Sequence, residues 1–296
     1  MKDVLIFANE SQFSKEIIHF FLSKHFNVHV CSIKPFKDKT IFISALPLQL
    51  KISIMNVANH YNWKHEVSKH DIIINTLQYN DFQSYAQSSV FENFTHQFAE
   101  ATLNLGKKVI YLSNVLNESS YTSHINEAEQ SMIQINQDIF YTKYAFLIDS
   151  KSRFLLSIMN SPVIFTSKNV LKSTIAITNS ADIQNHILNI INGTHSIHNT
   201  YLSGESFTIS DIIEIIQRYI GKKAIITLPH FLLQTLGKIL GFFPQSFYAR
   251  YLNYKYIIKR LEHNNDYPKH NRNTHYTLFA LIIEKHSRNI WNPKID

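Results

Sequence analysis

The sequence is poor in glycine and cysteine, and both shortages limit what the chain can be. Only six of the 296 residues are glycine, and none of them precedes Gly106. The single cysteine, Cys31, excludes an internal disulfide framework and favours a reducing compartment. No apolar run reaches the roughly 20 residues of a membrane-spanning helix, because the longest, Phe231 to Phe243, is shorter and contains Lys238. The first residues run directly into a predicted strand, so we also expect no signal peptide.

The charge of the chain is concentrated at its end. Residues 222–296 contain 12 Lys and Arg against 4 Asp and Glu, so the whole excess of +7 lies in the last quarter. A basic segment of this kind can attract an anionic membrane surface, nucleic acid or an acidic protein partner. Aromatic and basic residues alternate between Tyr248 and Arg260, which favours a docking surface there. Nucleic acid is the least favoured partner, because no RNA- or DNA-binding motif accompanies these residues.

Sixteen histidines raise the question of a metal site. The sequence has no HExxH motif and no cluster of cysteine and histidine at ligand spacing. His195 and His198 fall in a predicted loop beside Gly193. Dispersed surface histidines are therefore the better interpretation, and we predict no metal site. P-loop and Gly-x-Ser-x-Gly motifs are absent as well.

The start of the chain predicts a βαβ unit. Val4 to Phe7 is a continuous apolar run, as expected of a strand with both faces covered. The following segment has apolar residues at helical spacing, namely Ile17, Ile18, Phe21 and Leu22. A second strand is predicted at Asn27 to Ser32. Such a unit opens dinucleotide-binding folds, whose connecting turn needs glycines that this chain lacks.

Strands and helices alternate along the rest of the chain. We expect strands at 50–55, 70–75, 108–113, 139–141, 173–177 and 200–202, and helices at 61–68, 89–105, 121–135, 153–159, 183–191 and 210–220. Ser210 is the expected N-cap of the last helix, and Gly221 follows its end. This order predicts an α/β fold, a Rossmann-like doubly wound parallel sheet with a smaller, mainly helical C-terminal lobe. The expected domains are 1–221, including some segments of the C-terminal lobe, and 222–296.

With these residues in view, the chain resembles the extended and atypical short-chain dehydrogenase/reductase superfamily, which includes NAD-dependent epimerases and dehydratases. The passage Tyr201-Leu202-Ser203-Gly204-Glu205-Ser206-Phe207-Thr208-Ile209-Ser210-Asp211 carries the likeness, followed by Ile220-Gly221-Lys222-Lys223 and Leu228-Pro229. Within the superfamily, the likeness is greatest to the accessory-subunit family of respiratory complex I, whose members carry bound NADPH. It covers roughly residues 2–245.

The resemblance implies that the cofactor-binding positions have changed. The superfamily's three glycines fall on Ala8, Ser11 and Ser14. Its acidic residue after the third strand falls on or near Asn56, and the glycine closing its fourth strand falls near Gln78, whose side chain would project toward the cofactor groove. Added Cβ atoms and an acidic residue in the turn oppose a pyrophosphate. We therefore expect no cofactor, with NADPH or NAD as the alternative if backbone N–H groups of the turn still bind it.

The resemblance also implies that the catalytic residues are incomplete. The Tyr-x-x-x-Lys pair falls on Tyr121 and Ile125, so its lysine is missing. Without that ammonium group, Tyr121 would keep a phenol pKa of about 10 and be a poor acid or base at neutral pH. Ser113 matches the serine that ends the fifth strand, and Glu129 matches a glutamate that follows the Tyr-Lys motif.

These features predict a degenerate, non-catalytic protein that acts as a structural or assembly component beside respiratory complex I. Its partner would be a complex I subunit, with the basic end on an anionic membrane surface. The expected location is the cytoplasm or the cytoplasmic or matrix face of an energy-transducing membrane. An active NAD(P)-dependent epimerase or reductase with a non-standard site, using Tyr121 and Ser113, is the alternative. A third possibility stays open, namely a decaying reading frame whose product keeps the fold but has no selected role.

Overall fold

The computed structural model divides the chain into two interleaved units. Residues 2–36, 49–55, 61–79, 81–82, 88–114, 120–147, 163–202, 204, 206–222 and 224–229 are described. The first unit comprises residues 1–145 and 180–202, and the second comprises residues 146–179 and 203–296. The second unit thus includes segments on both sides of residue 221, where the sequence places the domain boundary. Asn56, the helix expected at 153–159 and the aromatic and basic stretch from Tyr248 to Arg260 lie outside the described residues.

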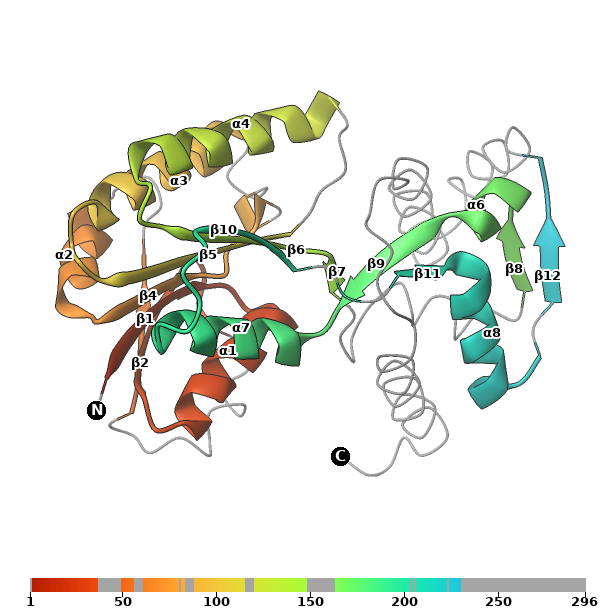
Figure 1. Cartoon of the computed structure of the whole chain (residues 1–296), viewed down its shortest axis with the longest axis horizontal. Coiled ribbons are helices and arrows are strands. Elements are labelled where there is room, and N and C mark those ends of the chain that lie inside the picture. The colour runs from red at the N-terminus through yellow and green to blue at the C-terminus, as the bar shows by residue number, and fades with distance from the viewer. Residues whose placement is uncertain are drawn as a thin grey trace. The chain divides into compact units, whose positions relative to one another are not determined.

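The first unit is built on a seven-stranded sheet in which every strand pair is parallel (Figure 1). The strands are β1 (Asp3–Ala8), β2 (Asn27–Ser32), β3 (Leu50–Ile54), β4 (Ile72–Asn75), β5 (Lys108–Asn114), β6 (Phe140–Tyr144) and β10 (Asn199–Leu202). Their order across the sheet is β10-β6-β5-β4-β1-β2-β3. This is the doubly wound order 3-2-1-4-5-6 with β10 added beside β6. The Rossmann-like parallel sheet predicted from the sequence is confirmed.

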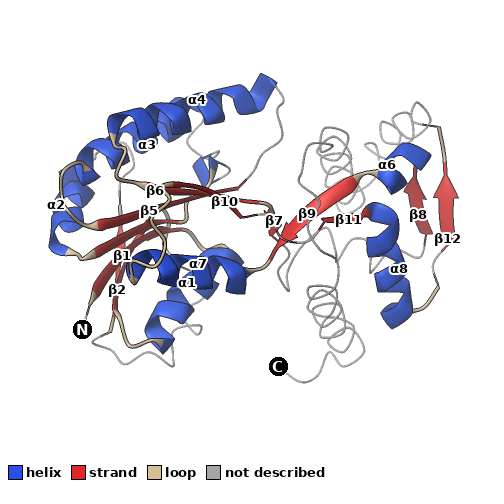
Figure 2. Cartoon of the chain, viewed as in Figure 1, coloured by secondary structure: helices blue, strands red, loops and turns tan. Residues whose placement is uncertain are grey.

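Helices cover both faces of this sheet (Figure 2). They are α1 (Gln12–Ser23), α2 (Tyr61–Lys69), α3 (Ser88–Thr102), α4 (Ser120–Ile135) and α7 (Ser180–Ile191). Helices α1 and α7 contact each other on one face, and α2, α3 and α4 lie on the other. The apolar stripe of α1 is buried as its spacing predicts, with Ile17, Ile18 and Phe21 fully shielded from solvent.

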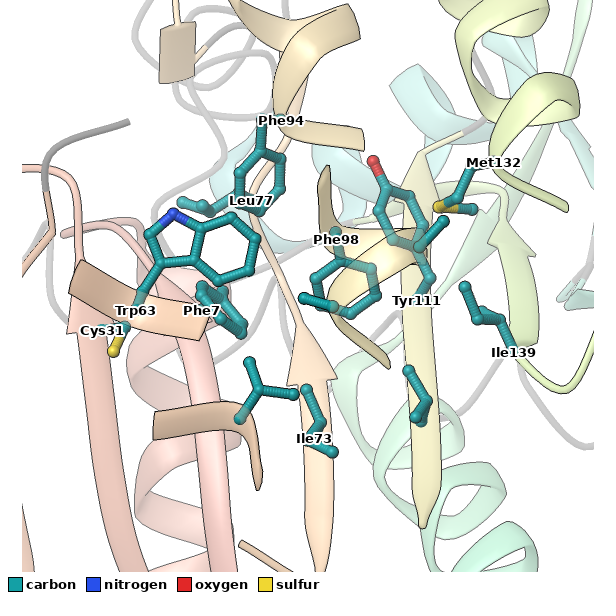
Figure 3. Packing of buried hydrophobic residues seen from close by; sticks show 14 of the residues in the cluster. Phe7, Cys31, Trp63, Ile73, Leu77, Phe94, Phe98, Tyr111, Met132 and Ile139 are labelled. Carbon is teal, nitrogen blue, oxygen red and sulfur yellow. The ribbon is translucent and has the colours of Figure 1, made fainter. Parts of the chain in front are cut away.

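The core beneath α2, α3 and α4 is rich in aromatic side chains (Figure 3). Phe7 of β1 contacts three other rings edge to face, those of Trp63, Phe94 and Phe98, at centroid distances of 5.2, 5.9 and 5.6 Å. Side chains alternate between the faces of a strand, so Leu5 and Phe7 share this face, and both belong to the cluster. The same face of β1 therefore anchors α2 and α3 at once.

The described residues of the second unit form two small sheets. Strands β7 (Phe146–Leu147), β9 (Thr174–Thr178) and β11 (Ser206–Thr208) form one, in the order β11-β9-β7. Strands β8 (Val163–Thr166) and β12 (Ala224–Thr227) form a parallel pair. Helices α6 (Lys168–Lys172) and α8 (Ile209–Ile220) complete the described part of this unit. Gly204 is required by packing, because a Cβ atom there would lie 1.6 Å from the carbonyl oxygen of Ile177.

The N-cap of α8 differs from the one predicted. The side chain of Thr208, not of Ser210, accepts the N–H of Asp211, at 3.0 Å, and the Asp211 carboxylate accepts the N–H of Thr208, at 2.9 Å. This reciprocal pair is a capping box, and its Thr-x-x-Asp spacing is readable in the sequence. Gly221 ends the helix with a φ of 100°, as expected. No helix in the described part of the chain is long and apolar enough to cross a membrane.

Candidate functional site

The order of the strands selects one edge of the large sheet as the candidate site. Strand β1 lies between β2 and β4, so the strand order reverses there. In open parallel sheets, ligands bind beyond the carboxyl ends of the strands at such a point. Here that point lies between Ala8, which ends β1, and Asn75, which ends β4. A hollow of about 360 Å³ lined by Lys107, Lys108 and other residues lies at the opposite, amino ends of β5 and β6.

The turn from β1 into α1 closes without glycine. The Asn9 side-chain oxygen accepts the N–H of Ser11 at 2.8 Å, and the Ser11 hydroxyl accepts the N–H of Ser14 at 3.1 Å. Ser11 is the N-cap of α1 and has extended backbone angles, φ −75° and ψ 153°. Between Ala8 and Ser14 no residue has a positive φ. The turn is thus closed by hydrogen bonds from main-chain N–H groups to side-chain oxygens, and it needs none of the backbone conformations that glycines allow in a dinucleotide-binding turn.

A chain of hydroxyl groups crosses from this turn to β4. The Thr76 hydroxyl donates to the carbonyl oxygen of Phe7 at 2.9 Å, and this oxygen can only accept. Ser14 must therefore donate in its 2.9 Å hydrogen bond to Thr76. The Ser11 hydroxyl in turn donates to Ser14 at 2.9 Å. The three hydroxyl groups form one directed chain that ends on the main chain of β1.

A partly buried carboxyl group, that of Asp81, forms a second connection between the β1–α1 turn and the residues after β4. Asp81 accepts a hydrogen bond from the Asn9 side-chain amide and another, at 2.7 Å, from the N–H of Gln78. Burial raises the pKa of Asp81 to about 6, although the Gln78 N–H and the charge of Lys34 act in the opposite direction. The β1–α1 turn itself contains an acid, Glu10, which forms an ion pair with Lys15 at 3.5 Å.

Gln78 joins the carboxyl ends of two neighbouring strands. Its side-chain amide donates to the carbonyl oxygens of Thr76, at 3.2 Å, and Leu112, at 2.9 Å. Its side-chain oxygen accepts the N–H of Asn114 at 2.9 Å. The side chain of Gln78, which the sequence predicts to project toward the cofactor groove, is therefore hydrogen-bonded to main-chain groups next to β4 and in β5.

Ser113 belongs to a separate cluster around a buried glutamate. Its hydroxyl donates to one carboxylate oxygen of Glu129 at 2.5 Å, and the Tyr141 hydroxyl donates to the other at 2.5 Å. Glu129 projects from α4 and is 3% exposed. Burial raises the pKa of Glu129, and burial together with the neighbouring carboxylate raises that of Tyr141. The hydroxyl proton of Ser113 is thus directed into the protein.

Isoleucine occupies the position where the resemblance expects the catalytic lysine. Ile125 is 4% exposed and packs into the core cluster. The ammonium group beside this part of α4 belongs to Lys143 of β6, which donates to the Asn126 side-chain oxygen at 3.1 Å. The same group lies 3.9 Å from a carboxylate oxygen of Glu129. The backbone of Tyr121 lies in α4.

No family model matches the chain, and no curated protein matches its sequence. Solved structures do match. A nucleoside-diphosphate-sugar epimerase from Staphylococcus aureus superposes with a TM-score of 0.65 at 12% identity, covering 95% of this chain and 99% of that one. The chain shares the epimerase fold.

Two further solved structures agree with this fold. The Bordetella bronchiseptica enzyme WbmG, in complex with NAD, has a TM-score of 0.61 at 12% identity and covers 77% of this chain and 81% of its own. The dTDP-glucose 4,6-dehydratase DesIV from Streptomyces venezuelae, with NAD and TYD bound, has a TM-score of 0.57 at 13% identity and covers 87% and 97%. At these identities the likeness establishes the fold of the present chain.

The structure brings some of the predicted positions together and adds residues that the sequence did not indicate. Ala8 ends β1, Ser11 caps α1 and Ser14 lies in the first turn of that helix, so the three flank the β1–α1 turn, whereas Ser113 is bound to Glu129. Thr76 and Asp81 were missed, because their role depends on β4 being the neighbour of β1. The signal available in the sequence was the position of these polar residues shortly after the buried apolar strand β4.

Proposed function

We propose that this chain is a non-catalytic protein on the epimerase/dehydratase fold that acts as a structural or assembly component. The observation that carries the proposal is the pair of side-chain connections between the β1–α1 turn and the residues after β4, through Ser14 and Thr76 and through Asn9 and Asp81. They occupy the place where a dinucleotide's pyrophosphate would approach a fold of this kind.

A dinucleotide would have to displace these contacts. Each of these hydrogen bonds that is given up without replacement, with its polar group still buried, costs on the order of 1–3 kcal/mol. The N–H of Ser14, one of the donors at the start of α1, is already bound by Ser11. The carboxyl groups of Asp81 and Glu10 lie at the turn and repel phosphate whenever they are ionised.

The catalytic half of the proposal rests on α4. A tyrosine acts as acid or base in this fold when a neighbouring cation lowers its pKa. Ile125 provides no charge, and Lys143 is engaged by Asn126 and Glu129. The Ser113 hydroxyl donates to Glu129 and so directs its proton away from any bound substrate.

Binding of NADH and NADPH to the purified full chain tests the cofactor part of the proposal. A ligand at 100 times its Kd stabilises a folded protein by about 2.7 kcal/mol, which thermal denaturation detects readily. We expect no shift for the natural chain and a gain of binding for the triple variant Ala8→Gly, Ser11→Gly, Ser14→Gly. If the triple variant does not fold, Asp81→Asn serves as the second variant. Tight binding of NADH or NADPH to the natural chain would overturn the proposal that the chain holds no cofactor.

For the partner, we propose respiratory complex I on the sequence resemblance alone. Affinity purification of the tagged full chain from respiring cells should then recover complex I subunits. A tagged chain whose basic residues between Tyr248 and Arg260 are replaced by glutamine is the matched control for the predicted docking surface. Recovery of no complex I subunit by the natural chain would refute this partner, while the non-catalytic role would still be judged by the binding experiment.

The alternative function is an active NAD(P)-dependent epimerase or reductase. The observation in its favour is the ammonium group of Lys143, which reaches α4 from β6, next to the position that lacks the lysine. Turnover of NAD(P)H with a nucleotide sugar or carbonyl compound, lost in both Tyr121→Phe and Lys143→Met, would establish it. Such turnover would refute the non-catalytic proposal.

A further inference from the structure

Three potential metal ligands meet at one end of α2. His29 lies in β2, Glu66 lies in α2, and His70 follows the last residue of that helix. One possible ligand atom from each lies within 4.8 Å of those from the other two. Both histidines are buried and Glu66 is partly buried. The sequence does not indicate this cluster, because His29 is far from the other two along the chain.

The distances within the cluster suit a small divalent ion. Zinc bonds of about 2.0–2.1 Å to nitrogen or oxygen imply ligand atoms about 3.3 Å apart in a tetrahedral site. The Nδ1 atom of His29 and the Oε2 atom of Glu66 are 3.3 Å apart. The His29 and His70 rings have centroids 5.2 Å apart and are tilted by 43°. One edge of the tetrahedron is therefore already formed, and the third ligand needs a small inward movement.

Hydrogen bonds fix which ring nitrogen of His70 can bind a metal. Its Nδ1 atom lies 2.7 Å from the carbonyl oxygen of Glu66, which can only accept, so Nδ1 carries the proton. The lone pair of the neutral ring is then on Nε2. A ligand histidine whose second nitrogen donates to a main-chain carbonyl is the usual arrangement at metal sites.

His29 has a corresponding partner in Ser53. The His29 Nε2 atom and the Ser53 hydroxyl are 2.8 Å apart, and a hydroxyl can donate or accept. When Ser53 accepts, Nε2 carries the proton and Nδ1 presents its lone pair toward Glu66. The ligand set is thus two neutral imidazoles and one carboxylate, each imidazole held by a second hydrogen bond.

We propose that His29, Glu66 and His70 form a binding site for a divalent transition-metal ion of the zinc type, with water as the fourth ligand. Imidazole and carboxylate are ligands that zinc shares with cobalt and nickel. A metal bound here would join α2 to the edge region of the sheet through β2. The site involves none of the residues of the β1–α1 turn.

Two lysines compete with a metal for Glu66. The ammonium groups of Lys69 and Lys51 lie 2.8 and 3.5 Å from its carboxylate oxygens. Their side chains are 48% and 64% exposed, so each can turn into solvent when a cation replaces it. Removing either charge should therefore tighten metal binding, an effect not expected if zinc bound elsewhere on the surface.

Titration of the chelator-treated full chain with Zn²⁺, monitored by calorimetry, tests the proposal. We expect one tight site, and Co²⁺ in its place should give the strong visible absorption of a tetrahedral complex. Glu66→Gln and His70→Gln should each weaken binding at least about tenfold. His65→Gln, on the exposed side of the same helix, is the matched control and should leave the affinity unchanged.

Lys51→Gln supplies a second readout that does not depend on removing a ligand. It should tighten Zn²⁺ binding several-fold, and melting temperatures of the metal-free variants verify that each one folds. The proposal is overturned if the natural chain takes up no Zn²⁺ at a single site. It is equally overturned if Glu66→Gln and His70→Gln bind as the natural chain does, because the metal would then be held by other histidines.

Discussion

Replacing Asp81 by asparagine should change how the stability of the protein depends on pH. Asp81 has a pKa of about 6 in the folded chain, compared with 3.8 for an ordinary aspartate. The folded state therefore holds the proton more tightly than the unfolded state. The resulting stabilisation is fully present below about pH 4 and is lost as the pH rises through 6. A difference of about two pKa units corresponds to up to about 3 kcal/mol.

Urea denaturation of the natural chain and of Asp81→Asn, at about pH 4, 5, 6 and 7, measures this effect. The free energy of unfolding of the natural chain minus that of the variant should fall by up to about 3 kcal/mol across this range. Groups that titrate in both proteins cancel in the difference. Asp138→Asn, at an exposed position, controls for the loss of one negative charge.

A difference that stays flat or rises between about pH 4 and 7 would refute the reasoning, because the Asp81 carboxyl would then not be held in its neutral form. The result bears directly on the candidate site. A confirmed pKa near 6 means that Asp81 is largely ionised at neutral pH while still bound by Asn9 and Gln78. Under the function proposed above, that charge would oppose the approach of a pyrophosphate.

Three further predictions concern other parts of the chain. Glu129→Leu should destabilise the first unit by about 2–6 kcal/mol in urea denaturation, because two buried hydroxyl groups lose their acceptor; a loss below about 1 kcal/mol would contradict this. Burial, followed by the charge of His195, lowers the pKa of His186 to about 4. As the pH falls, the unfolded state therefore takes up this proton before the folded state does. The free energy of unfolding of the natural chain should fall by up to about 3 kcal/mol between pH 6.5 and 4, and that of His186→Gln should fall by less. Equal losses in the two proteins would show that His186 is not the group responsible. Gly204→Ala should lower the melting temperature through a clash with a main-chain oxygen of β9, at a cost of about 1–3 kcal/mol or more, and an unchanged melting temperature would exclude that contact.

The central strands of the large sheet, such as β1 and β4, could be read from the sequence because they are buried on both faces. Ile72, Ile73 and Ile74 form a short uninterrupted apolar run between polar residues, which is typical of a strand covered on both faces. The pair β8 and β12 was not predicted. Each has only four residues, and the two segments lie about 60 residues apart, so their pairing leaves little local signal.

The candidate site was predictable only in part. The absence of glycine at Ala8, Ser11 and Ser14 is visible in the sequence, and it locates the turn between β1 and α1. What replaces the glycines is not visible there. The hydrogen bond from Ser14 to Thr76 joins residues 62 positions apart, and it follows from the order of strands rather than from any local pattern.

The interleaving of the two units has a consequence for synthesis on the ribosome. The chain leaves the first unit after Ala145, returns at Ser180 and leaves it again after Leu202. A nascent chain ending at residue 145 has six strands of the sheet but an unpaired edge at β6, and α1 lacks its neighbour α7. At about 5–20 residues per second, the ribosome needs roughly 3–11 s to add residues 146–202. During that interval the β6 edge is open to chaperones or to another nascent chain, so codons that slow elongation in this segment should increase aggregation.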